Sequence, residues 1–381
     1  MKCLFVHDHV FLKYENRYYS NGKLTYDILS NYLKYCDQLT VISRCKEVYK
    51  SPSDKYISEG NNVNIIGLPG LLTKKGIASR GKIKKLLEEH IRNSDFVISR
   101  LPSENGLLVN NIAKKLKKPL INEVVACPYD CLWFRGDLIA KLYAPILFLR
   151  TKSAILKSQY NIYVTNSYLQ LKYPSEGRSI GISDVNVSKV SEEVKSKNSR
   201  VLTIGVIGNP ALSLKGIKSL YEAISMIKEP VVLEIVGGLL NSEIEELMNV
   251  NPHVIQRGII SEREKLFKWL NSLDVYIQPS YTEGLPRSII EAMSVGLPVL
   301  GSNVGGIPEL VRSDALFSPG DVIGIANKIR TIMNDDVIYK ELSGHSLNIA
   351  NQYLVEKTEI VKNEFLNSFL SEEINISKRQ V

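Results

Sequence analysis

Residues 281–306 read YTEGLPRSIIEAMSVGLPVLGSNVGG, and the predicted fold is organised around this stretch. The apolar segment 274–278 precedes it and ends at Pro279, which predicts a short buried strand. A loop with Glu283 and Gly284 follows the strand. A strand that leads through a short loop into a helix is the repeating unit of an open α/β sheet.

A helix is predicted from Pro286, because a proline at the first helical position loses no intrahelical hydrogen bond. Gly296, followed by Pro298, predicts the end of this helix after about three turns. Side chains on one arc are apolar, namely Ile289, Ile290 and Met293. Those on the opposite arc are polar, namely Arg287, Ser288, Glu291 and Ser294. The free N–H groups at the start of such a helix point to the carboxyl edge of the sheet, so an anionic ligand is expected there.

Two carboxylates, Glu283 and Glu291, lie in this frame, one in the loop and one in the helix. Carboxylates accept hydrogen bonds in pairs, and the vicinal hydroxyls of a sugar or a ribose donate them in pairs. The two side chains could therefore hold different parts of one elongated ligand. The alternative is that both are ordinary solvated surface charges.

Four motifs in this region resemble the nucleotide-sugar signature of the family-4 glycosyltransferases. They are Glu283-Gly284-Leu285-Pro286, Glu291-Ala292-Met293, Gly296-Leu297-Pro298-Val299 and Gly305-Gly306-Ile307-Pro308-Glu309-Leu310-Val311, in the order and at the spacing of that family. The resemblance implies a retaining glycosyltransferase of GT-B architecture, with two Rossmann-like domains that face each other across a cleft. No cofactor is implied, and a nucleoside-diphosphate sugar is the expected donor substrate.

The resemblance also implies roles for individual residues. Glu291 would hold the ribose hydroxyls and Glu283 the hydroxyls of the donor sugar. Lys215, after the glycine turn that ends the first strand of the second half, would stabilise the departing diphosphate. The N–H groups of Gly284 and Leu285 and those around Pro286 would assist it, and so could the side chains of Arg287 and Ser288. For Lys215 the bland alternative is a solvated lysine next to a helix start.

Other strand ends in the second half could contact the nucleotide. The turn Gly208-Asn209 could hold the diphosphate through backbone N–H groups together with Lys215, although this signal alone is weak. Gly258-Ile259 lies at a further strand end, and there simple turn geometry is an equal alternative. The family usually has an arginine after the first glycine turn, but Asn209 and Pro210 take its place here. No Asp-x-Asp motif occurs, so nothing in the sequence requires a divalent metal.

The first half offers fewer signals. Asn21-Gly22 is the only candidate for the glycine pair that many relatives place after the first strand. Many relatives also have a histidine near the reacting sugar, but Glu123 stands at the corresponding strand end and is the third candidate catalytic residue. Arg100 and Asp130 are predicted to face the cleft and to contact sugar or acceptor. An ion pair between Arg100 and Glu123 that only shapes the cleft is the alternative.

Strand and helix patterns alternate twice along the chain, which predicts two doubly wound parallel sheets. The predicted boundaries are 1–185 for an acceptor-binding domain and 186–354 for a nucleotide-sugar-binding domain. A helix at about 355–381 could pack back on the first domain, as the GT-B resemblance implies. In the first domain a strand at 2–7 is expected to end in a polar loop, and 163–165 is expected to be the last strand.

Charge is distributed unevenly between the halves. Residues 1–200 hold 32 Lys and Arg against 18 Asp and Glu, a balance of +14, and residues 201–381 have a balance of −6. The basic half suggests a polyanion or an anionic membrane as its partner, and aromatic residues are not interleaved with the basic ones as nucleic-acid binding would need. The segment 138–157 is apolar with basic residues, as in a helix that lies on a bilayer or in an ordinary amphipathic helix.

The start of the chain is too short and too soon charged for a signal peptide, and no apolar run could span a bilayer. These features predict a cytoplasmic protein that can lie on the inner face of the plasma membrane. The predicted function is transfer of a hexose, without a metal, from a nucleoside diphosphate to a saccharide or lipid-linked saccharide in cell-surface polysaccharide or glycolipid assembly. The alternatives are a GT-B isomerase of the 2-epimerase type, and a non-catalytic nucleotide-sugar-binding subunit of a polysaccharide assembly complex.

Overall fold

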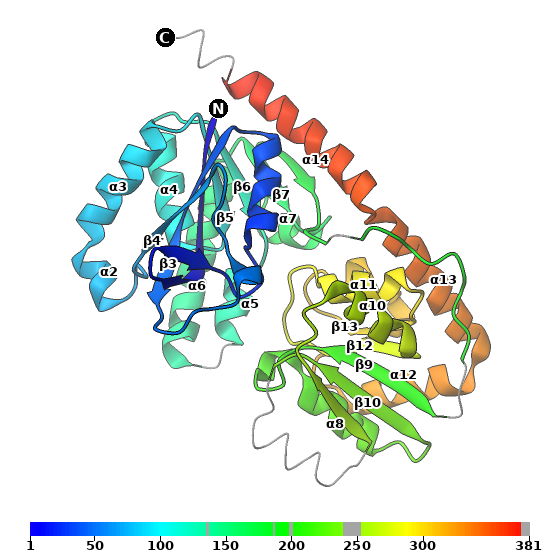
Figure 1. Cartoon of the computed structure of the whole chain (residues 1–381). Coiled ribbons are helices and arrows are strands. Elements are labelled where there is room, and N and C mark those ends of the chain that lie inside the picture. The colour runs from blue at the N-terminus through cyan, green and yellow to red at the C-terminus, as the bar shows by residue number, and fades with distance from the viewer. Residues whose placement is uncertain (135–136, 186, 198–200, 239–252, 375–381) are drawn as a thin grey trace.

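The computed structural model describes residues 1–134, 137–185, 187–197, 201–238 and 253–374. Two α/β units lie side by side, each built on its own parallel sheet with helices on both faces (Figure 1). This confirms the fold class predicted from the alternating strand and helix patterns.

The first unit contains an eight-stranded sheet in the order β4-β3-β1-β5-β6-β7-β8, with β2 paired to β1 outside this path. All neighbouring strands run parallel except β1 and β2. The carboxyl ends of the parallel strands therefore lie at one edge, which is the edge that faces the second unit (Figure 1). The strands are β1 (Lys2–Tyr14), β2 (Arg17–Tyr19), β3 (Gln38–Glu47), β4 (Val63–Leu68), β5 (Phe96–Leu101), β6 (Leu120–Val124), β7 (Tyr160–Tyr163) and β8 (Arg178–Gly181).

Alternating side chains of β1 reach opposite faces of this sheet, as the period of a strand requires. Leu4 and Val6 pack under α3 and α4, whereas Phe5 packs under α1 and α14. Local caps fix some helix starts: Ser103 accepts from the N–H of Gly106 at the start of α4. The helices and 3₁₀ turns are α1 (Tyr26–Leu29), η1 (Ser30–Lys34), η2 (Asp54–Tyr56), α2 (Lys74–Ala78), α3 (Arg80–Arg92), α4 (Glu104–Lys115), α5 (Pro128–Trp133), α6 (Leu138–Leu156) and α7 (Tyr168–Lys172).

The second unit contains a six-stranded parallel sheet in the order β11-β10-β9-β12-β13-β14. The strands are β9 (Leu202–Ile207), β10 (Val231–Val236), β11 (Val254–Gly258), β12 (Val275–Gln278), β13 (Val299–Ser302) and β14 (Leu316–Phe317). The helices and 3₁₀ turns are η3 (Ser213–Lys215), α8 (Ile217–Ser225), α10 (Arg263–Ser272), α11 (Arg287–Ser294), η4 (Ile307–Glu309), η5 (Ser313–Ala315), α12 (Val322–Asn334) and α13 (Asp336–Gln352).

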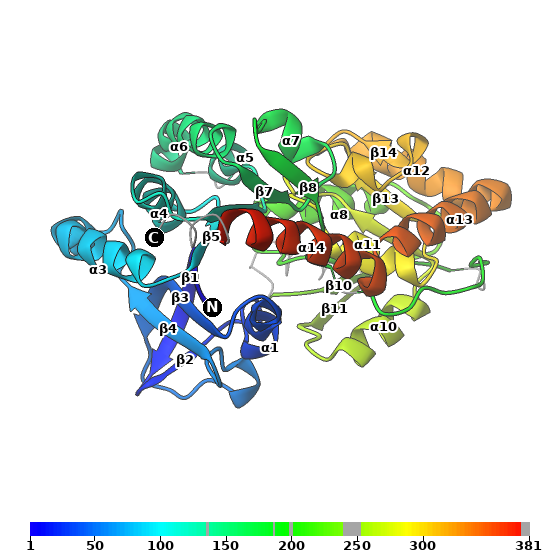
Figure 2. The same cartoon turned by 90° about the horizontal axis from the view of Figure 1, so that it is seen from above.

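The C-terminal helix α14 (Val355–Phe369) crosses from the second unit to the first (Figures 1 and 2). Phe365 and Phe369 are buried against the first sheet, where Phe369 contacts the rings of Phe96 and Tyr160. A π-helical turn, η6 (Leu370–Ile374), continues it. Where the connecting segment meets the start of α14, Val187 and Leu354 form an isolated parallel bridge. The chain thus crosses between the units twice, and the two crossings run together.

Three local expectations were wrong. The strand predicted at 2–7 continues to Tyr14, because after an irregularity at Val6 to Val10 its register with β3 resumes and Phe11 becomes fully buried. The last strand of the first sheet is β8, which pairs with β7, rather than 163–165. Helix α11 begins one residue later than predicted, with Pro286 as its N-cap residue, and spans eight residues.

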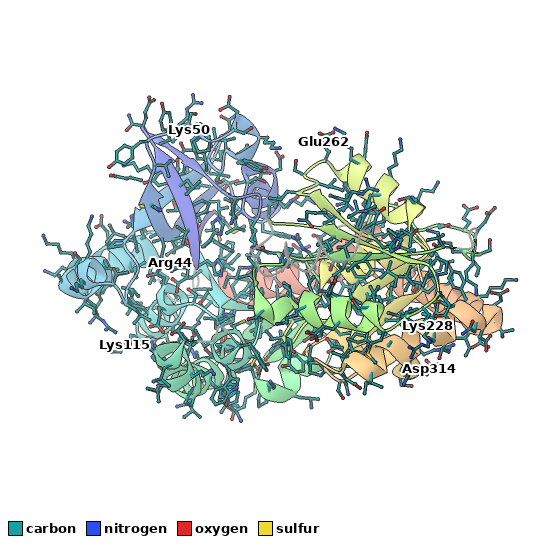
Figure 3. All side chains as sticks on the ribbon, turned by 90° about the horizontal axis from the view of Figure 1, so that it is seen from below. Arg44, Lys50, Lys115, Lys228, Glu262 and Asp314 are labelled. Atoms are coloured by element: carbon teal, nitrogen blue, oxygen red, sulfur yellow. The ribbon has the colours of Figure 1, made fainter. Side chains whose placement is uncertain are left out.

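The two units also differ in the charged residues at their surfaces. Seen from below, Figure 3 labels Arg44, Lys50 and Lys115 on the first unit and the acidic Glu262 and Asp314 on the second, where Lys228 lies as well. This arrangement follows the opposite charge balance of the two halves of the sequence.

Candidate active site

The loop between β12 and α11 lies where the strand order of the second sheet reverses. The chain goes from β9 outward to β10 and β11, and then returns to the other side of β9 as β12. Such a switch point leaves a crevice at the carboxyl ends of the two central strands. Residues that follow β9 and residues that follow β12 therefore meet there, although about 70 positions separate them.

Lys215 and Glu283 form an ion pair across this crevice. The Lys215 Nζ lies 2.6 Å from Glu283 Oε1, and the two side chains are 24% and 14% exposed. The same carboxylate oxygen accepts from Ser280 Oγ at 2.7 Å and from Gln278 Nε2 at 3.3 Å. Two residues predicted to be catalytic are thus in direct contact, and the carboxylate is held in one orientation.

Gln278 organises the floor of this site, and the sequence reasoning missed it. Its side chain is 1% exposed, and its Oε1 accepts from Tyr276 OH at 2.7 Å and from Ser288 Oγ at 3.1 Å. Ser302 Oγ donates to the carbonyl of Ser280 at 2.6 Å and so fixes the loop from β13. Ser288, a predicted diphosphate contact, therefore donates its hydroxyl hydrogen to Gln278. A polar residue as the last residue of a buried strand was the signal that could have identified Gln278.

The loop offers free hydrogen-bond donors next to the ion pair. Among the described residues, no acceptor contacts the backbone N–H groups of Glu283, Gly284 or Leu285. Gly284 also lies against the end of β6, since a Cβ at this position would come within 2.5 Å of the carbonyl oxygen of Val125. Only glycine fits where the two units approach this closely.

Glu291 is the one acidic residue on the polar face of α11. Within the described ranges the carboxylate of Glu291 has no hydrogen-bond or ion-pair partner. Burial raises the pKa of this carboxyl, and the nearby Arg287 and Arg263 offset part of that rise. Arg287 is exposed, whereas Ser294 is buried and donates to the carbonyl of Glu291, so the polar arc is not uniformly solvated. A half-buried carboxylate without a partner is a suitable acceptor for ligand hydroxyls.

The predicted glycine turns lie at neighbouring strand ends. The N–H of Gly208, after β9, donates to the carbonyl of Val236 at 2.9 Å, and Asn209 Oδ1 accepts from the N–H of Ala211 at 3.1 Å. Gly258 at the end of β11 has a φ of +68° and open space at the Cβ position. Ile259 is 74% exposed. These positions have turn geometry, and their contact with a nucleotide stays a prediction.

Arg100 and Glu123 form the ion pair that was the alternative to direct ligand contacts. Arg100 donates to Glu123 Oε2 at 2.7 Å and also pairs with Asp184, while Tyr32 OH donates to Glu123 Oε1 at 2.8 Å. Partial burial opposes ionisation of Asp184, whose side chain keeps 43% of its surface exposed, but Arg100 outweighs this effect and holds the pKa of this carboxyl below its ordinary value. Glu123 is 5% exposed, and both of its carboxylate oxygens accept hydrogen bonds, so the carboxylate helps to shape this edge of the sheet. A catalytic role for Glu123 stays a prediction.

Asp130 lines a pocket of about 460 Å³ between the two units. Its Oδ2 accepts from Lys172 Nζ at 2.8 Å and from Tyr168 OH at 2.5 Å. The pocket is formed by residues of both units, including Asp130, Phe134, Leu171, Tyr281, Asn303 and Pro319. Asp130 therefore lies in the cleft as predicted for an acceptor contact, although the contact itself stays a prediction.

The predicted glycine pair Asn21-Gly22 is exposed in the loop after β2, and Gly22 has a φ of +92°. A histidine does lie near this edge, on the first strand, where the sequence analysis did not identify it as a candidate site residue. His7, on β1, has its Nδ1 buried without a partner among the described residues. Burial and the nearby Arg100 lower its pKa well below the ordinary value, so the ring is neutral. The described part of the chain contains no group of three or more His, Cys, Asp or Glu that could hold a metal ion.

Glu309, the acidic residue of the Gly305–Val311 motif, joins the two units. From η4 its carboxylate accepts from the backbone N–H groups of Asn166 and Tyr168, each at 2.6 Å, and from that of Ser167 at 3.1 Å. These N–H groups open α7 and have no intrahelical partner, so an anion at this position is favoured. The motif thus fixes the relative position of the units at the pocket.

Glu309→Gln should therefore lower the free energy of unfolding by about 1–2 kcal/mol, because a neutral amide oxygen replaces a carboxylate on three backbone donors. We expect a lower urea midpoint and a larger radius of gyration by small-angle X-ray scattering. Glu341→Gln is the matched control, since Glu341 is 55% exposed and its pair with Arg312 lies within the second unit. An unchanged midpoint and radius for Glu309→Gln would contradict the interpretation.

This chain is similar to known proteins both in sequence and in fold. The family model described as Glycosyl transferases group 1 matches residues 199–335. The chain is 34% identical to Protein CapJ of Staphylococcus aureus over 380 residues, which cover 97% of this chain and 96% of that protein. It is 27% identical over 278 residues to N,N'-diacetylbacillosaminyl-diphospho-undecaprenol alpha-1,3-N-acetylgalactosaminyltransferase of Campylobacter jejuni, covering 68% and 73% of the two chains. The crystal structure of Anabaena Alr3699/HepE in complex with UDP has the same fold, with a TM-score of 0.69, 18% identity and coverage of 97% and 100%.

Proposed function

Since this chain belongs to the group 1 glycosyl transferases of GT-B fold, we propose that it transfers a hexose from a nucleoside-diphosphate sugar to a hydroxyl acceptor with retention at the anomeric carbon. The observation that carries the proposal is the Lys215–Glu283 ion pair at the switch point of the second sheet, next to free backbone N–H groups.

The leaving diphosphate would lie against these donors. Negative charge grows on the diphosphate as the glycosidic bond breaks, and preorganised donors lower the barrier most where charge develops. The Lys215 ammonium and the N–H groups of Glu283, Gly284 and Leu285 supply such donors without a metal ion. Glu291 would hold the ribose, and Glu283 would bind donor-sugar hydroxyls through its second oxygen, Oε2, for which the described residues supply no partner.

Retention would come from attack by the acceptor on the face from which the diphosphate departs. Glu283 is a poor candidate for a protein nucleophile, because Lys215, Ser280 and Gln278 all donate to one oxygen of its carboxylate. These three donors occupy the lone pairs of that oxygen, and the second oxygen is the one proposed to bind the hydroxyls of the donor sugar. We infer that the departing phosphate itself takes the proton of the acceptor hydroxyl.

A saccharide, free or linked to a lipid, is the proposed acceptor, and cell-surface polysaccharide or glycolipid assembly is the proposed context. The pocket between the units has room for a sugar and offers the paired Asp130 and Lys172 as polar contacts. The Campylobacter relative acts, by its name, on a sugar linked to diphospho-undecaprenol. Both observations favour a saccharide acceptor that binds in this pocket.

The nucleotide site can be tested by thermal stabilisation with UDP, GDP, ADP, CDP and dTDP, with and without Mg²⁺. A ligand at 100 times its Kd stabilises the folded protein by about 2.7 kcal/mol, so a selective rise in Tm is expected. Glu291→Ala should reduce this rise by at least half, because the ribose loses its acceptor. Glu222→Ala, an exposed carboxylate on α8, is the matched control.

Donor turnover then separates the candidate activities. Release of nucleoside diphosphate that needs an added acceptor supports transfer, whereas conversion of the donor without acceptor indicates an isomerase. Binding without any turnover indicates a non-catalytic subunit. No stabilisation by any of the five nucleotides would contradict the proposed donor site.

A further inference from the structure

Helix α6 is apolar on two opposite faces, and only one of them is covered. Its inner face packs into the core of the first unit through Ala140, Ala144, Leu147 and Ile155. Its outer face presents five large apolar side chains that are 52–80% exposed, namely Leu138, Ile139, Leu142, Ile146 and Leu149. At 3.6 residues per turn these five fall within an arc of about 100°. A helix with this pattern is normally buried all round, in a core or in a lipid phase.

We call these five residues the apolar strip of α6. Apolar residues scattered singly over a surface are normal, but a continuous strip marks an interaction site. None of the described helices is long and apolar enough to cross a membrane, so any contact of α6 with lipid lies along the surface.

Basic residues flank the apolar strip. Lys141 Nζ lies 5.8 Å from the ring of Trp133, which is 42% exposed at the end of α5, and Lys152 Nζ lies 6.0 Å from the ring of Phe148. Helix α6 itself carries three basic residues, Lys141, Arg150 and Lys152, and no acidic residue. Long basic side chains beside an apolar face, with a tryptophan at its edge, are typical of helices that lie at the interface of an anionic bilayer.

We propose that the apolar strip of α6 inserts into the surface of an anionic lipid bilayer, with Trp133 at the level of the headgroups and the flanking lysines on the lipid phosphates. The charge excess favours lipid over a second copy of the chain, because two copies meeting at this strip would also bring their basic residues together. An apolar strip alone would suit either occupant.

If the chain transfers a sugar to a lipid-linked acceptor, as proposed above, the position of the apolar strip of α6 affects how that acceptor reaches the pocket. Helix α5 directly precedes the segment that leads into α6, and Asp130 and Phe134 from this region line the pocket between the units. Leu171, which is 81% exposed, lines the same pocket. Bilayer contact through α6 therefore brings the pocket close to the lipid surface, where a lipid-linked saccharide could enter it without leaving the bilayer.

The test uses the full chain with vesicles of phosphatidylglycerol and phosphatidylcholine in a sedimentation assay. Leu142→Ser/Ile146→Ser should lower the partition coefficient at least tenfold, because both side chains lose their apolar insertion. Lys141→Gln/Lys152→Gln should lower it about fivefold per lysine, and added salt should abolish this difference. Ile323→Ser/Val337→Ser, which removes exposed apolar residues from the second unit, is the matched control and should bind as wild type.

Tryptophan fluorescence gives an independent readout. The chain has two tryptophans, and Trp269 is 7% exposed, so a blue shift and quenching by brominated lipid would report Trp133. Equal vesicle binding by wild type and Leu142→Ser/Ile146→Ser, or no binding by wild type, would overturn the proposal. So would a wild-type dimer in lipid-free sedimentation that becomes monomeric in this variant, since the strip would then hold a second copy. Nucleotide stabilisation should stay unchanged in all these variants, so failure here is distinguishable from failure of the proposed function.

Discussion

Lys215→Met should lower kcat for donor turnover about 10²- to 10³-fold, the usual effect of removing one preorganised donor from a developing negative charge. The variant keeps the aliphatic part of the side chain and loses only the ammonium. Because Ser280 and Gln278 still hold Glu283, the geometry of the carboxylate should survive. The missing arginine after the first glycine turn strengthens the expectation, since Asn209 and Pro210 carry no compensating charge.

Release of nucleoside diphosphate measures this effect, with the donor chosen from the nucleotide panel. Lys228→Met is the matched control, because Lys228 is exposed on the second unit (Figure 3) and precedes β10, at the edge of the sheet opposite the carboxyl ends of the strands. The Tm of Lys215→Met should change little, since partly exposed ion pairs contribute about 1 kcal/mol or less. A kcat within threefold of wild type would place the leaving diphosphate elsewhere.

Arg100→Met should cause the largest loss of stability, about 3 kcal/mol, because it leaves the buried Glu123 carboxylate without its cation. Arg100 is 15% exposed and Glu123 is 7% exposed, so water reaches neither freely. We place the loss at the low end of the range for buried pairs because Asp184 is 43% exposed and can be hydrated. Urea unfolding measures it. Arg92→Met, which breaks an exposed pair with Glu88, should cost less than 1 kcal/mol.

The loss of stability caused by Arg100→Met should become smaller as pH falls. Asp184 has a folded-state pKa held below its ordinary value by Arg100, so its ion pair contributes stability above the unfolded pKa and loses that contribution as pH falls. The difference in unfolding free energy between wild type and Arg100→Met should therefore narrow below about pH 5. Arg100→Met/Glu123→Gln should recover part of the loss at neutral pH, because it removes the uncompensated charge. A constant difference from pH 7 to pH 4 would show that lost packing, and not charge, causes the destabilisation.

Much of the second unit could be predicted from the sequence. Its site is built from short segments that each follow a buried strand, and the polar residues after β9 and β12 converge because parallel strands end at one edge. The helix with Glu291 on its polar face and Gly296 at its end, where φ is +76°, follow from this local order. Local spacing carries this information because each contact depends on the strand, turn and helix next to it. The pairing of Lys215 with Glu283 joins residues 68 positions apart and was not predicted.

The first unit was less predictable at its site. The resemblance focused attention on the strand end at Glu123, whereas a neutral histidine comes from β1 and the carboxylate is taken up by Arg100 and Tyr32. The polar loop expected after 2–7 became strand because its pairing with β3 buries Phe11. Strand pairing between distant segments overrides local polarity, and this cannot be read from the local sequence.

The amino-acid order was therefore enough to predict the two parallel sheets and the family, and to name the residues proposed for the donor site, because period, turn residues and motif spacing are properties of neighbouring positions. Three features became visible only in the folded chain: Glu309 holds the units together, Arg100 is enclosed by acidic side chains, and the outer face of α6 is left uncovered. Each of these depends on which segments far apart in the chain meet in space. Burial and ion pairing depend on which segments pack together, so they cannot be read from the residues next to each position in the sequence.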